Sequence, residues 1–176
     1  EGTTADRLVE AGIALIAQGG LRALTIRDVA AVAGIAFPSV QHHFPAKAML
    51  VDEIFAAVER NHCAATARAL ADLAPAPDDW PALAEVASAV LADWCAGQRT
   101  LTIAAHEMLL AAHRDPRHRA FGERWIDGQC AAWGALLAKL GMGGDADTAW
   151  LIIELLLGLS LRTFGCENQA EAALAN

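Results

Sequence analysis

Hydrophobic residues recur every three or four positions along most of the chain, which is the period of an amphipathic helix. A first stripe from Leu8 to Ile16 predicts a helix from about residue 4 to Gln18, which Gly19-Gly20 would end. The same period predicts later helices at about 26–32, 37–44, 46–73, 81–96, 98–113, 117–140 and 145–165. No segment alternates between apolar and polar residues as a half-buried strand does, so we predict an all-α fold.

Capping residues mark two of these helix starts. Thr3 and Thr25 each precede an aspartate by three residues, at Asp6 and Asp28, which is the spacing of a capping box. Gly34 is expected to end the second helix, because glycine adopts the left-handed backbone of a helix C-cap. The ends of the short N-terminal helices are therefore predicted more sharply than those of the long helices that follow.

The segment from Thr25 to Lys47 contains two predicted helices joined by a glycine turn, which is the arrangement of a helix-turn-helix motif. The second helix of such a motif enters the major groove of B-DNA and presents side chains to base edges. Four apolar residues are spaced to pack the two helices together: Ala30, Ile35, Val40 and Phe44. The other residues of the second helix would then remain exposed.

Residues 8–55 resemble the DNA-binding segment of the TetR family of bacterial repressors. The family pattern is T-x-x-x-[IV]-A-x-x-A-G-[VI], a short recognition helix and a closing aromatic-Phe-x-x-Lys. Eight residues fall on this pattern without gaps: Thr25, Val29, Ala30, Ala33, Gly34, Ile35, Phe44 and Lys47. The resemblance implies a DNA-binding headpiece over residues 1–47, with three helices. An antiparallel helical domain for effector binding and dimerisation would follow over residues 48–176.

The resemblance also implies which residues contact double-stranded DNA. Eight positions correspond to DNA-contacting positions of the family: Thr25, Arg27, Phe37, Ser39, Gln41, His42, His43 and Lys47. Lys47 would anchor a phosphate at a helix N-terminus, where anions are favoured. For Phe37, contact with a thymine methyl and a hydrophobic staple beside Pro38 are both open, and the histidines and Lys47 are alternatively ordinary surface residues.

The headpiece departs from common family members at several positions. Ala36, Phe37, Pro38, Gln41 and His43 stand where the family often has serine, a basic residue, glycine or tyrosine. Ala46 replaces the usual capping residue before the long helix. These changes remove cationic or hydroxyl phosphate contacts, so the operator sequence cannot be transferred by analogy.

Composition and charge agree with a helical protein that is not a general nucleic-acid coat. The 41 alanines among 176 residues favour helices. The net charge is −8, and residues 51–176 carry all of this excess, with nine basic and seventeen acidic side chains. Residues 1–50 carry four of each and sum to zero, so the headpiece is electrostatically distinct from the rest.

The resemblance further implies that the later helices hold a small, largely apolar effector and a homodimer interface. Seven residues are candidates for effector binding: His62, Trp94, Ile103, Glu107, Met108, Gln129 and Trp133. For each of them, an ordinary place in the core is the alternative. The helices at about 117–140 and 145–165 are the candidates for dimerisation. Trp150, Ile153, Leu157 and Leu161 share one face of the last helix.

Other function classes find little support in the sequence. The apolar run from Ala149 to Leu161 contains Glu154 and is too short to span a membrane, so we predict no membrane contact. Four widely spaced cysteines indicate reduced thiols and a cytoplasmic location. A metal enzyme is an alternative because of Glu59 and His62, but a second Glu-x-x-His motif is missing. We therefore predict no enzyme activity, metal or cofactor, and keep as the alternative an interaction module whose headpiece does not bind DNA.

Overall fold

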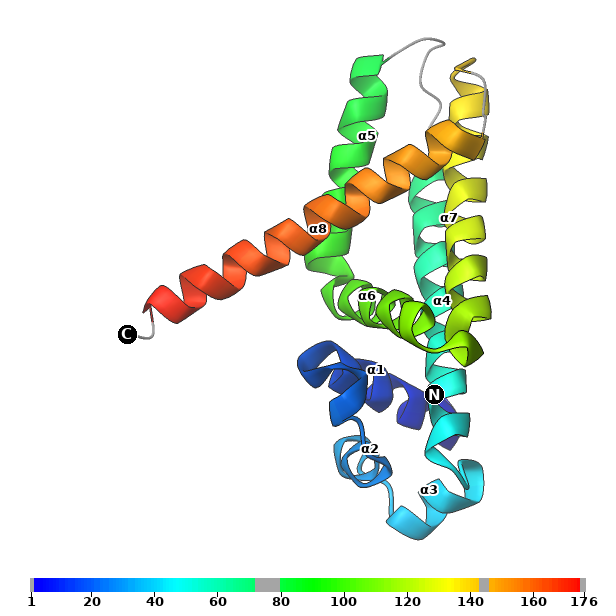
Figure 1. Cartoon of the computed structure of the whole chain (residues 1–176), viewed down its shortest axis with the longest axis vertical. Coiled ribbons are helices and arrows are strands. Elements are labelled where there is room, and N and C mark those ends of the chain that lie inside the picture. The colour runs from blue at the N-terminus through cyan, green and yellow to red at the C-terminus, as the bar shows by residue number, and fades with distance from the viewer. Residues whose placement is uncertain (1, 72–79, 143–145, 175–176) are drawn as a thin grey trace. The chain divides into compact units, whose positions relative to one another are not determined.

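The computed structural model describes residues 2–71, 80–142 and 146–174, and these residues form helices and no strands. The all-α prediction is confirmed. In chain order the helices are α1 (Thr4–Ala23), α2 (Ile26–Ala33), α3 (Phe37–His43), α4 (Lys47–Ala71), α5 (Trp80–Ala92), the π-helical segment η1 (Asp93–Gly97), α6 (Arg99–Arg114), the 3-10 turn η2 (Pro116–His118), α7 (Arg119–Lys139) and α8 (Ala146–Leu174) (Figure 1).

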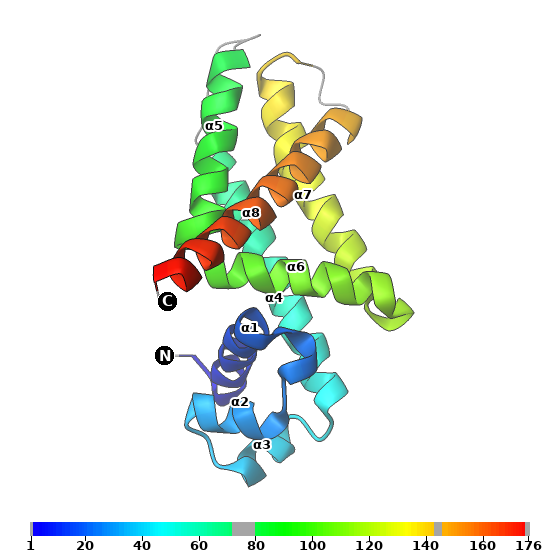
Figure 2. The same cartoon turned by 60° about the vertical axis from the view of Figure 1, so that its left-hand side comes forward.

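The helices divide between two compact units. Unit 1 consists of Glu1–His62 and Thr100–Trp125, and unit 2 consists of Cys63–Arg99 and Ile126–Asn176. In unit 1, α2 packs on α1 and α3 packs on α2 (Figures 1 and 2). In unit 2, α8 contacts α5 and η1. Each unit buries its own apolar side chains, among them Leu8 and Phe55 in unit 1, and Trp133 in unit 2.

The first helix begins as predicted, and the predicted glycine pair interrupts it. The Thr3 side chain accepts a hydrogen bond from the Asp6 backbone N–H at 3.2 Å, and Asp6 accepts one from the Thr3 N–H at 2.7 Å, so the capping box is present. The predicted break at Gly19-Gly20 is present, because Gly20 has a non-helical backbone with φ at +72° and ψ at 170°. The range Thr4–Ala23 therefore joins two helical segments across this kink. Glycine allows this left-handed backbone, which interrupts the helix.

The helix-turn-helix follows the predicted local signals closely. Thr25 caps α2 by accepting a hydrogen bond from the Asp28 N–H at 3.1 Å. Gly34 ends α2 with φ at +63°, and the Ile35 N–H donates back to the Ala30 carbonyl at 3.0 Å. A glycine with this backbone satisfies the last carbonyl groups of the helix and turns the chain toward α3.

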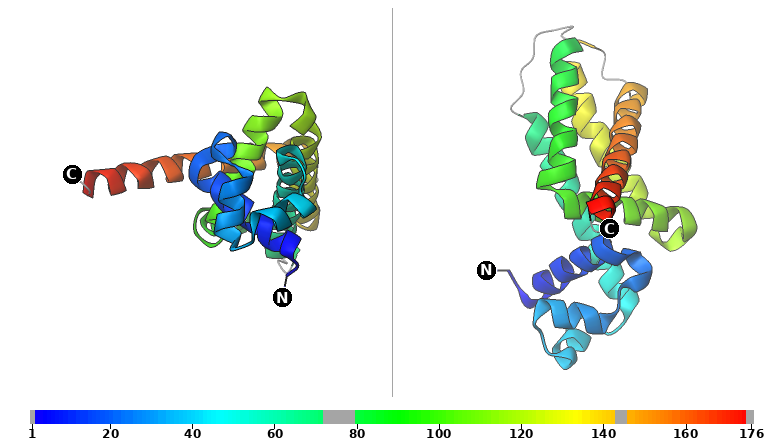
Figure 3. Two further views of the ribbon diagram at one scale, coloured as in Figure 1. Left: turned by 90° about the horizontal axis from the view of Figure 1, so that it is seen from below. Right: turned by 90° about the vertical axis from the view of Figure 1, so that its left-hand side faces the viewer.

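The last helix combines a buried side with a long exposed apolar face. Trp150, Leu151, Leu155 and Leu161 are all exposed, whereas Ile153 is buried. The stripe predicted from Trp150 to Leu161 is therefore divided between interior and surface. The helix is also longer than predicted, and its C-terminal half extends away from α5 and α7 (Figures 1 and 3).

One stretch of α8 also meets the length and composition of a membrane span. Ala146–Cys166 has a mean hydropathy of 1.5, and 28% of the stretch is buried in this chain. A core or interface helix of a soluble protein has the same properties, so this single stretch is weak support for a membrane segment.

Candidate DNA-binding surface and interior sites

The recognition helix α3 is held by very few side chains. Val40 is fully buried and Phe44 is nearly so, and together they anchor the helix in unit 1. Ala36 precedes the helix without a side-chain cap, and Pro38 occupies the first turn, where a missing N–H costs little. The rest of α3 is consequently exposed at its surface.

The predicted DNA-contacting residues of α3 all lie on this exposed surface. Ser39, Gln41, His42 and His43 are exposed, and Phe37 is 37% exposed. The His42 and His43 rings meet edge to face with their centroids 5.7 Å apart. Hydroxyl, amide and imidazole groups can all bond to base edges or phosphates, so this surface has the chemistry that DNA contact requires.

The structure gives two of the other predicted residues a local role within the headpiece. The Thr25 hydroxyl donates to Asp28 Oδ2 at 2.6 Å, so its proton is used within the cap. The Arg27 guanidinium lies 5.9 Å from the centre of the Phe37 ring, which links the starts of α2 and α3 by a cation–π contact. Lys47 is exposed and is the first residue of the 25-residue helix α4.

Two headpiece residues were missed from the sequence. Thr4, at the start of α1, lines a shallow groove together with Ser39, His42 and His43. Arg7 donates to the Ala33 carbonyl at 2.6 Å and so ties α1 to the end of α2. Both residues lie in α1, outside the two helices of the motif. Their spacing in the sequence does not indicate that folding brings Thr4 near α3 and Arg7 near the end of α2.

The predicted effector residues fall into two sets, one in each unit. Unit 1 contains His62, Ile103, Glu107 and Met108, and unit 2 contains Trp94, Gln129 and Trp133. Five of them are completely buried, and Ile103 and Glu107 are half-buried. The five buried residues therefore have the environment expected of core residues, which was the alternative for each.

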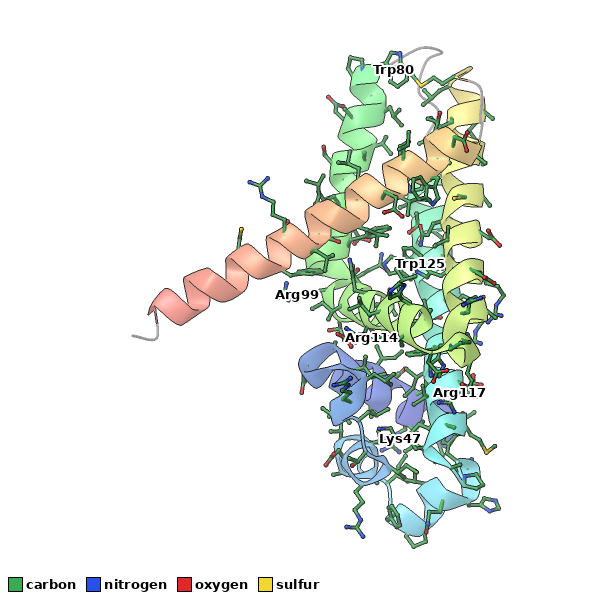
Figure 4. The ribbon with its side chains drawn as sticks, in the orientation of Figure 1. Lys47, Trp80, Arg99, Arg114, Arg117 and Trp125 are labelled. Atoms are coloured by element: carbon green, nitrogen blue, oxygen red, sulfur yellow. The ribbon has the colours of Figure 1, made fainter. Side chains whose placement is uncertain are left out.

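The set in unit 1 is built around a buried histidine pair. His62 Nε2 lies 3.2 Å from the Thr102 hydroxyl, and His106 Nδ1 donates to the Thr102 carbonyl at 2.8 Å. The His62 ring is 5.4 Å from that of Trp125, which Figure 4 labels. Burial, and to a lesser degree His106, lowers the pKa of His62 to about 3, so the imidazole is neutral at physiological pH.

Glu107 has a different position from the rest of its set. Its carboxylate accepts a hydrogen bond from the Leu21 N–H at 3.3 Å, just after the kink at Gly20. A Cβ at Gly20 would lie 3.1 Å from that carboxylate, which is a tight contact, and the φ of +72° at this position also favours glycine. Glu107 thus fixes the end of α1 to α6.

In unit 2, two of the three predicted effector residues, Trp94 and Gln129, make polar contacts through their side chains. Trp94 lies in the π-helical segment η1 and donates its indole N–H to the Thr66 hydroxyl at 3.3 Å. The Gln129 amide lies 3.8 Å from the Cys63 sulfur. Trp133 is fully buried, and its indole N–H has no acceptor among the described residues.

Both residues that suggested a metal enzyme have other partners, since His62 contacts Thr102 and Glu59 forms an ion pair. Glu59 is bound by the Arg124 guanidinium, with Nε 2.9 Å and Nη2 2.7 Å from Oε2. Asp115 is bound in the same manner by Arg117, which lowers the pKa of the Asp115 carboxyl to about 2. Within the described ranges, no three His, Cys, Asp or Glu residues are arranged to hold a metal ion.

The sequence matches the family models of both halves of a known regulator class. Residues 8–54 match the model described as bacterial regulatory proteins, tetR family. Residues 78–175 match the model described as tetracyclin repressor-like, C-terminal domain. The second match alone covers more than half of the chain.

Individual relatives agree with these matches. The HTH-type transcriptional repressor KstR2 of Rhodococcus jostii is 49% identical over 47 residues, which are 27% of this chain and 23% of that protein. The aligned part therefore spans about a quarter of KstR2.

Solved structures extend the likeness to the whole fold. The transcriptional regulator SCO7518 from Streptomyces coelicolor A3(2) has a TM-score of 0.71 at 21% identity, covering 91% of this chain and 86% of that one. The multidrug binding protein EbrR, complexed with imidazole, has a TM-score of 0.68 at 28% identity, covering 93% and 86%. Together with the family models, these findings mean that the chain belongs to the TetR family of bacterial transcription regulators.

Proposed function

We propose that this regulator is a cytoplasmic repressor that binds a palindromic operator as a homodimer and is released by a small, largely apolar effector. Residues 1–47 serve as the headpiece, and residues 48–176 bind the effector and the second copy. The observation that carries the proposal is the surface of α3, where every residue except Val40 is exposed and several are polar.

The charge of the headpiece supports DNA binding through a few defined contacts. Residues 1–50 sum to zero, in contrast with the deficit of eight in the remainder. Arg27 and Lys47 supply cations at the two ends of the motif, and the α4 N-terminus adds a favourable dipole for phosphate. Gln41 and His42 are the side chains that we assign to base edges, because amides and imidazoles pair with purine acceptors and donors.

The exposed face of α8 supports dimerisation. Trp150, Leu151, Leu155 and Leu161 are between 46% and 62% exposed in the single chain. Gly158 and Gly165 share this face, and a Cβ at either would meet nothing within 4 Å. Two copies of such a face can pack closely about a two-fold axis, and a two-fold axis is what a palindromic operator requires.

A largely apolar effector is supported by the buried aromatic residues of both units, and one relative binds small aromatic molecules. The buried indole N–H of Trp133 could donate a hydrogen bond to an effector, and ligand sites combine such a polar group with burial. The relative EbrR is named a multidrug binding protein and has been solved with imidazole, proflavin and ethidium. We propose that an effector shifts the dimer between two headpiece arrangements, of which one fits the operator.

The test is a selection of duplexes from a random DNA pool in about 100 mM salt, which suppresses non-specific phosphate binding. Enrichment of a palindrome by the wild-type chain supports the proposal, and the spacing of its half-sites reports the distance between headpieces. The control is the Gln41→Ala/His42→Ala variant, which should enrich the palindrome far less while remaining a dimer. A folded dimer that enriches no sequence contradicts the proposal.

That contradictory outcome would favour an interaction module whose headpiece does not bind DNA. The observation behind this second candidate is that α3 contains no lysine or arginine. Most DNA-binding surfaces gain affinity from such cations. A co-purified protein partner that competes for α3 would distinguish this function from weak DNA binding.

A further inference from the structure

A crevice in unit 1 remains outside the proposed DNA and effector residues, apart from Lys47 and Glu107. It has a volume of about 660 Å³ and is formed where the end of α1, the start of α4 and the end of α6 meet. Small-molecule sites commonly have volumes of roughly 300–1,000 Å³. Apolar lining comes from Leu21, Val51 and Ala111, so a compact apolar group can be covered there.

Four basic side chains and three carboxylates, those of Asp52, Glu107 and Asp115, line this crevice. Two of the lining carboxylates are occupied, since Arg117 binds Asp115 with a shortest distance of 2.6 Å and Glu107 accepts from the Leu21 N–H. Arg22, Lys47 and Arg114 also line the crevice, and none of the three forms an ion pair among the described residues. Figure 4 labels Lys47, Arg114 and Arg117 where α1, α4 and α6 of this unit converge.

A buried histidine also lines this crevice. His118 lines the crevice and is only 9% exposed, and its Nδ1 has no hydrogen-bond partner among the described residues. The Asp52 carboxylate lies 3.9 Å from that nitrogen, which is beyond hydrogen-bond distance. The other ring nitrogen, Nε2, lies 4.0 Å from Asp115 Oδ2, so the imidazole lies between two carboxylates and is not one of the groups that would hold the anion.

We propose that this crevice binds a small organic anion, with a carboxylate or phosphate head group and a compact apolar body. Arg22, Lys47 and Arg114 would hold the head group, and charge-assisted hydrogen bonds to such groups are among the strongest in proteins. The apolar body would lie against Leu21, Val51 and Ala111. Apart from Glu107, the site shares no residue with the set proposed for the apolar effector, and it requires neither DNA nor a second copy.

A bound anion would also affect the proposed DNA contacts. Lys47 is the phosphate anchor in the proposed function, and an anion in the crevice would compete with the operator for its ammonium group. This consequence rests on the proposed function. The primary test therefore measures ligand binding in the absence of DNA, so that each proposal can fail without the other.

The test is calorimetric titration of the DNA-free full chain with phenyl phosphate, with inorganic phosphate and benzyl alcohol as comparison probes. We expect saturable binding of one phenyl phosphate per chain, and affinities at least about tenfold weaker for both comparison probes, which each lack half of the required chemistry. Arg114→Gln should weaken phenyl phosphate binding by about tenfold. Arg119→Gln makes the same charge change at an exposed arginine outside the crevice and should leave the affinity unchanged.

Several results would overturn the proposal. One is the absence of saturable phenyl phosphate binding to the wild-type chain. Another is an equal loss in Arg114→Gln and Arg119→Gln, which would indicate general attraction of anions to the protein. Equal affinities for inorganic phosphate and phenyl phosphate would show that the apolar lining does not contribute to binding, which contradicts the proposed apolar body of the ligand. Both arginines are exposed, and matching thermal unfolding curves would verify that the variants fold like the wild type.

Discussion

Helices α3 and α8 both present exposed side chains, but the two surfaces have opposite chemistry. The seven-residue α3 buries Val40 and exposes hydroxyl, amide and imidazole groups. The much longer α8 buries Ile153 and exposes Trp150, Leu151 and Leu155. A polar surface is stable in water without a partner, whereas an apolar one gains roughly 25 cal/mol for each Å² that a partner covers.

This difference indicates what kind of partner each surface has. The α3 surface suits a hydrated, charged partner such as DNA, which is bound mainly through hydrogen bonds and phosphate contacts. The α8 face suits a second copy of itself, since an isologous interface requires the same apolar patch on both sides. The four predictions that follow test this division, beginning with the largest expected effect.

A charge on the apolar face of α8 should have the largest effect. In Leu155→Glu, two carboxylates would be buried in the proposed dimer, which should cost at least about 3 kcal/mol of dimerisation free energy. Sedimentation velocity should then show a monomer that has lost operator binding. Leu110→Glu is the control, because Leu110 is an exposed leucine on α6, and this variant should remain a dimer. A dimer that survives Leu155→Glu would remove α8 from the interface.

Salt should affect operator binding by α3 far more than dimerisation through α8, and this difference should be almost as large as the effect of Leu155→Glu. If Arg27 and Lys47 of both copies each neutralise one phosphate, operator affinity should fall about a hundredfold between about 50 mM and about 200 mM salt. The dimerisation constant of the DNA-free chain should change by less than about twofold, because apolar contacts are not screened by salt. Fluorescence anisotropy with labelled operator and sedimentation equilibrium measure the two constants. A salt-insensitive operator complex would contradict the phosphate contacts.

Acid should destabilise the fold through His62, which belongs neither to the α3 surface nor to the exposed face of α8. The pKa of His62 is lowered from 6.5 to about 3 by burial, so the unfolded chain binds a proton that the folded chain excludes. Stability is therefore complete above the unfolded pKa and is lost as the pH falls toward 3, with about 2 kcal/mol lost at about pH 5. Urea unfolding at about pH 7 and pH 5 measures how much unfolding free energy is lost between the two pH values. In His62→Gln this loss should be about 2 kcal/mol smaller than in the wild type.

The exposed His113 provides the control for this acid effect. His113→Gln should retain the wild-type pH dependence, and so should changes in α3 or on the exposed face of α8. An unchanged loss in His62→Gln would mean that other groups cause the acid sensitivity.

Truncation of one polar side chain on α3 should have the smallest effect. Gln41→Ala should weaken binding to the selected operator by about tenfold, which is the typical value of one good base contact. Anisotropy titrations measure this loss, and Gln18→Ala, at an exposed glutamine of α1, should show none. Since Gln41 is exposed, neither folding nor dimerisation should change. Unaltered affinity in Gln41→Ala would place base contact elsewhere on α3.

Much of the fold was predictable because its signals are local. Thr3 and Thr25 cap α1 and α2 as their spacing with Asp6 and Asp28 predicts. Gly34 adopts the left-handed backbone that the helix end requires. Gly20 adopts a similar φ and interrupts the first helix as predicted, but the N–H of the next residue donates to a side chain 86 residues away. That long-range contact leaves no trace in the spacing of residues near Gly20.

The candidate sites were predictable to different degrees for the same reason. The exposed residues of α3 could be identified because a short motif specifies both the helix and the residue that anchors it. The interior residues could be named only as members of apolar helices, and Glu107 proved to contact the end of α1 as well as line a crevice. Arg22, Arg114 and His118 carried no signal, since each is an ordinary polar residue near a helix end.

Residue order alone specified the helices, the helix-turn-helix and the family, because caps, glycine turns and helical periodicity act among residues within a few positions of each other. It also specified that the last helix is apolar on several sides. Long-range packing decided which of those sides is covered and which remains exposed. It also decided that Arg22, Lys47 and Arg114 meet around one crevice. Burial and proximity depend on contacts between distant segments, and these contacts exist only in the folded chain.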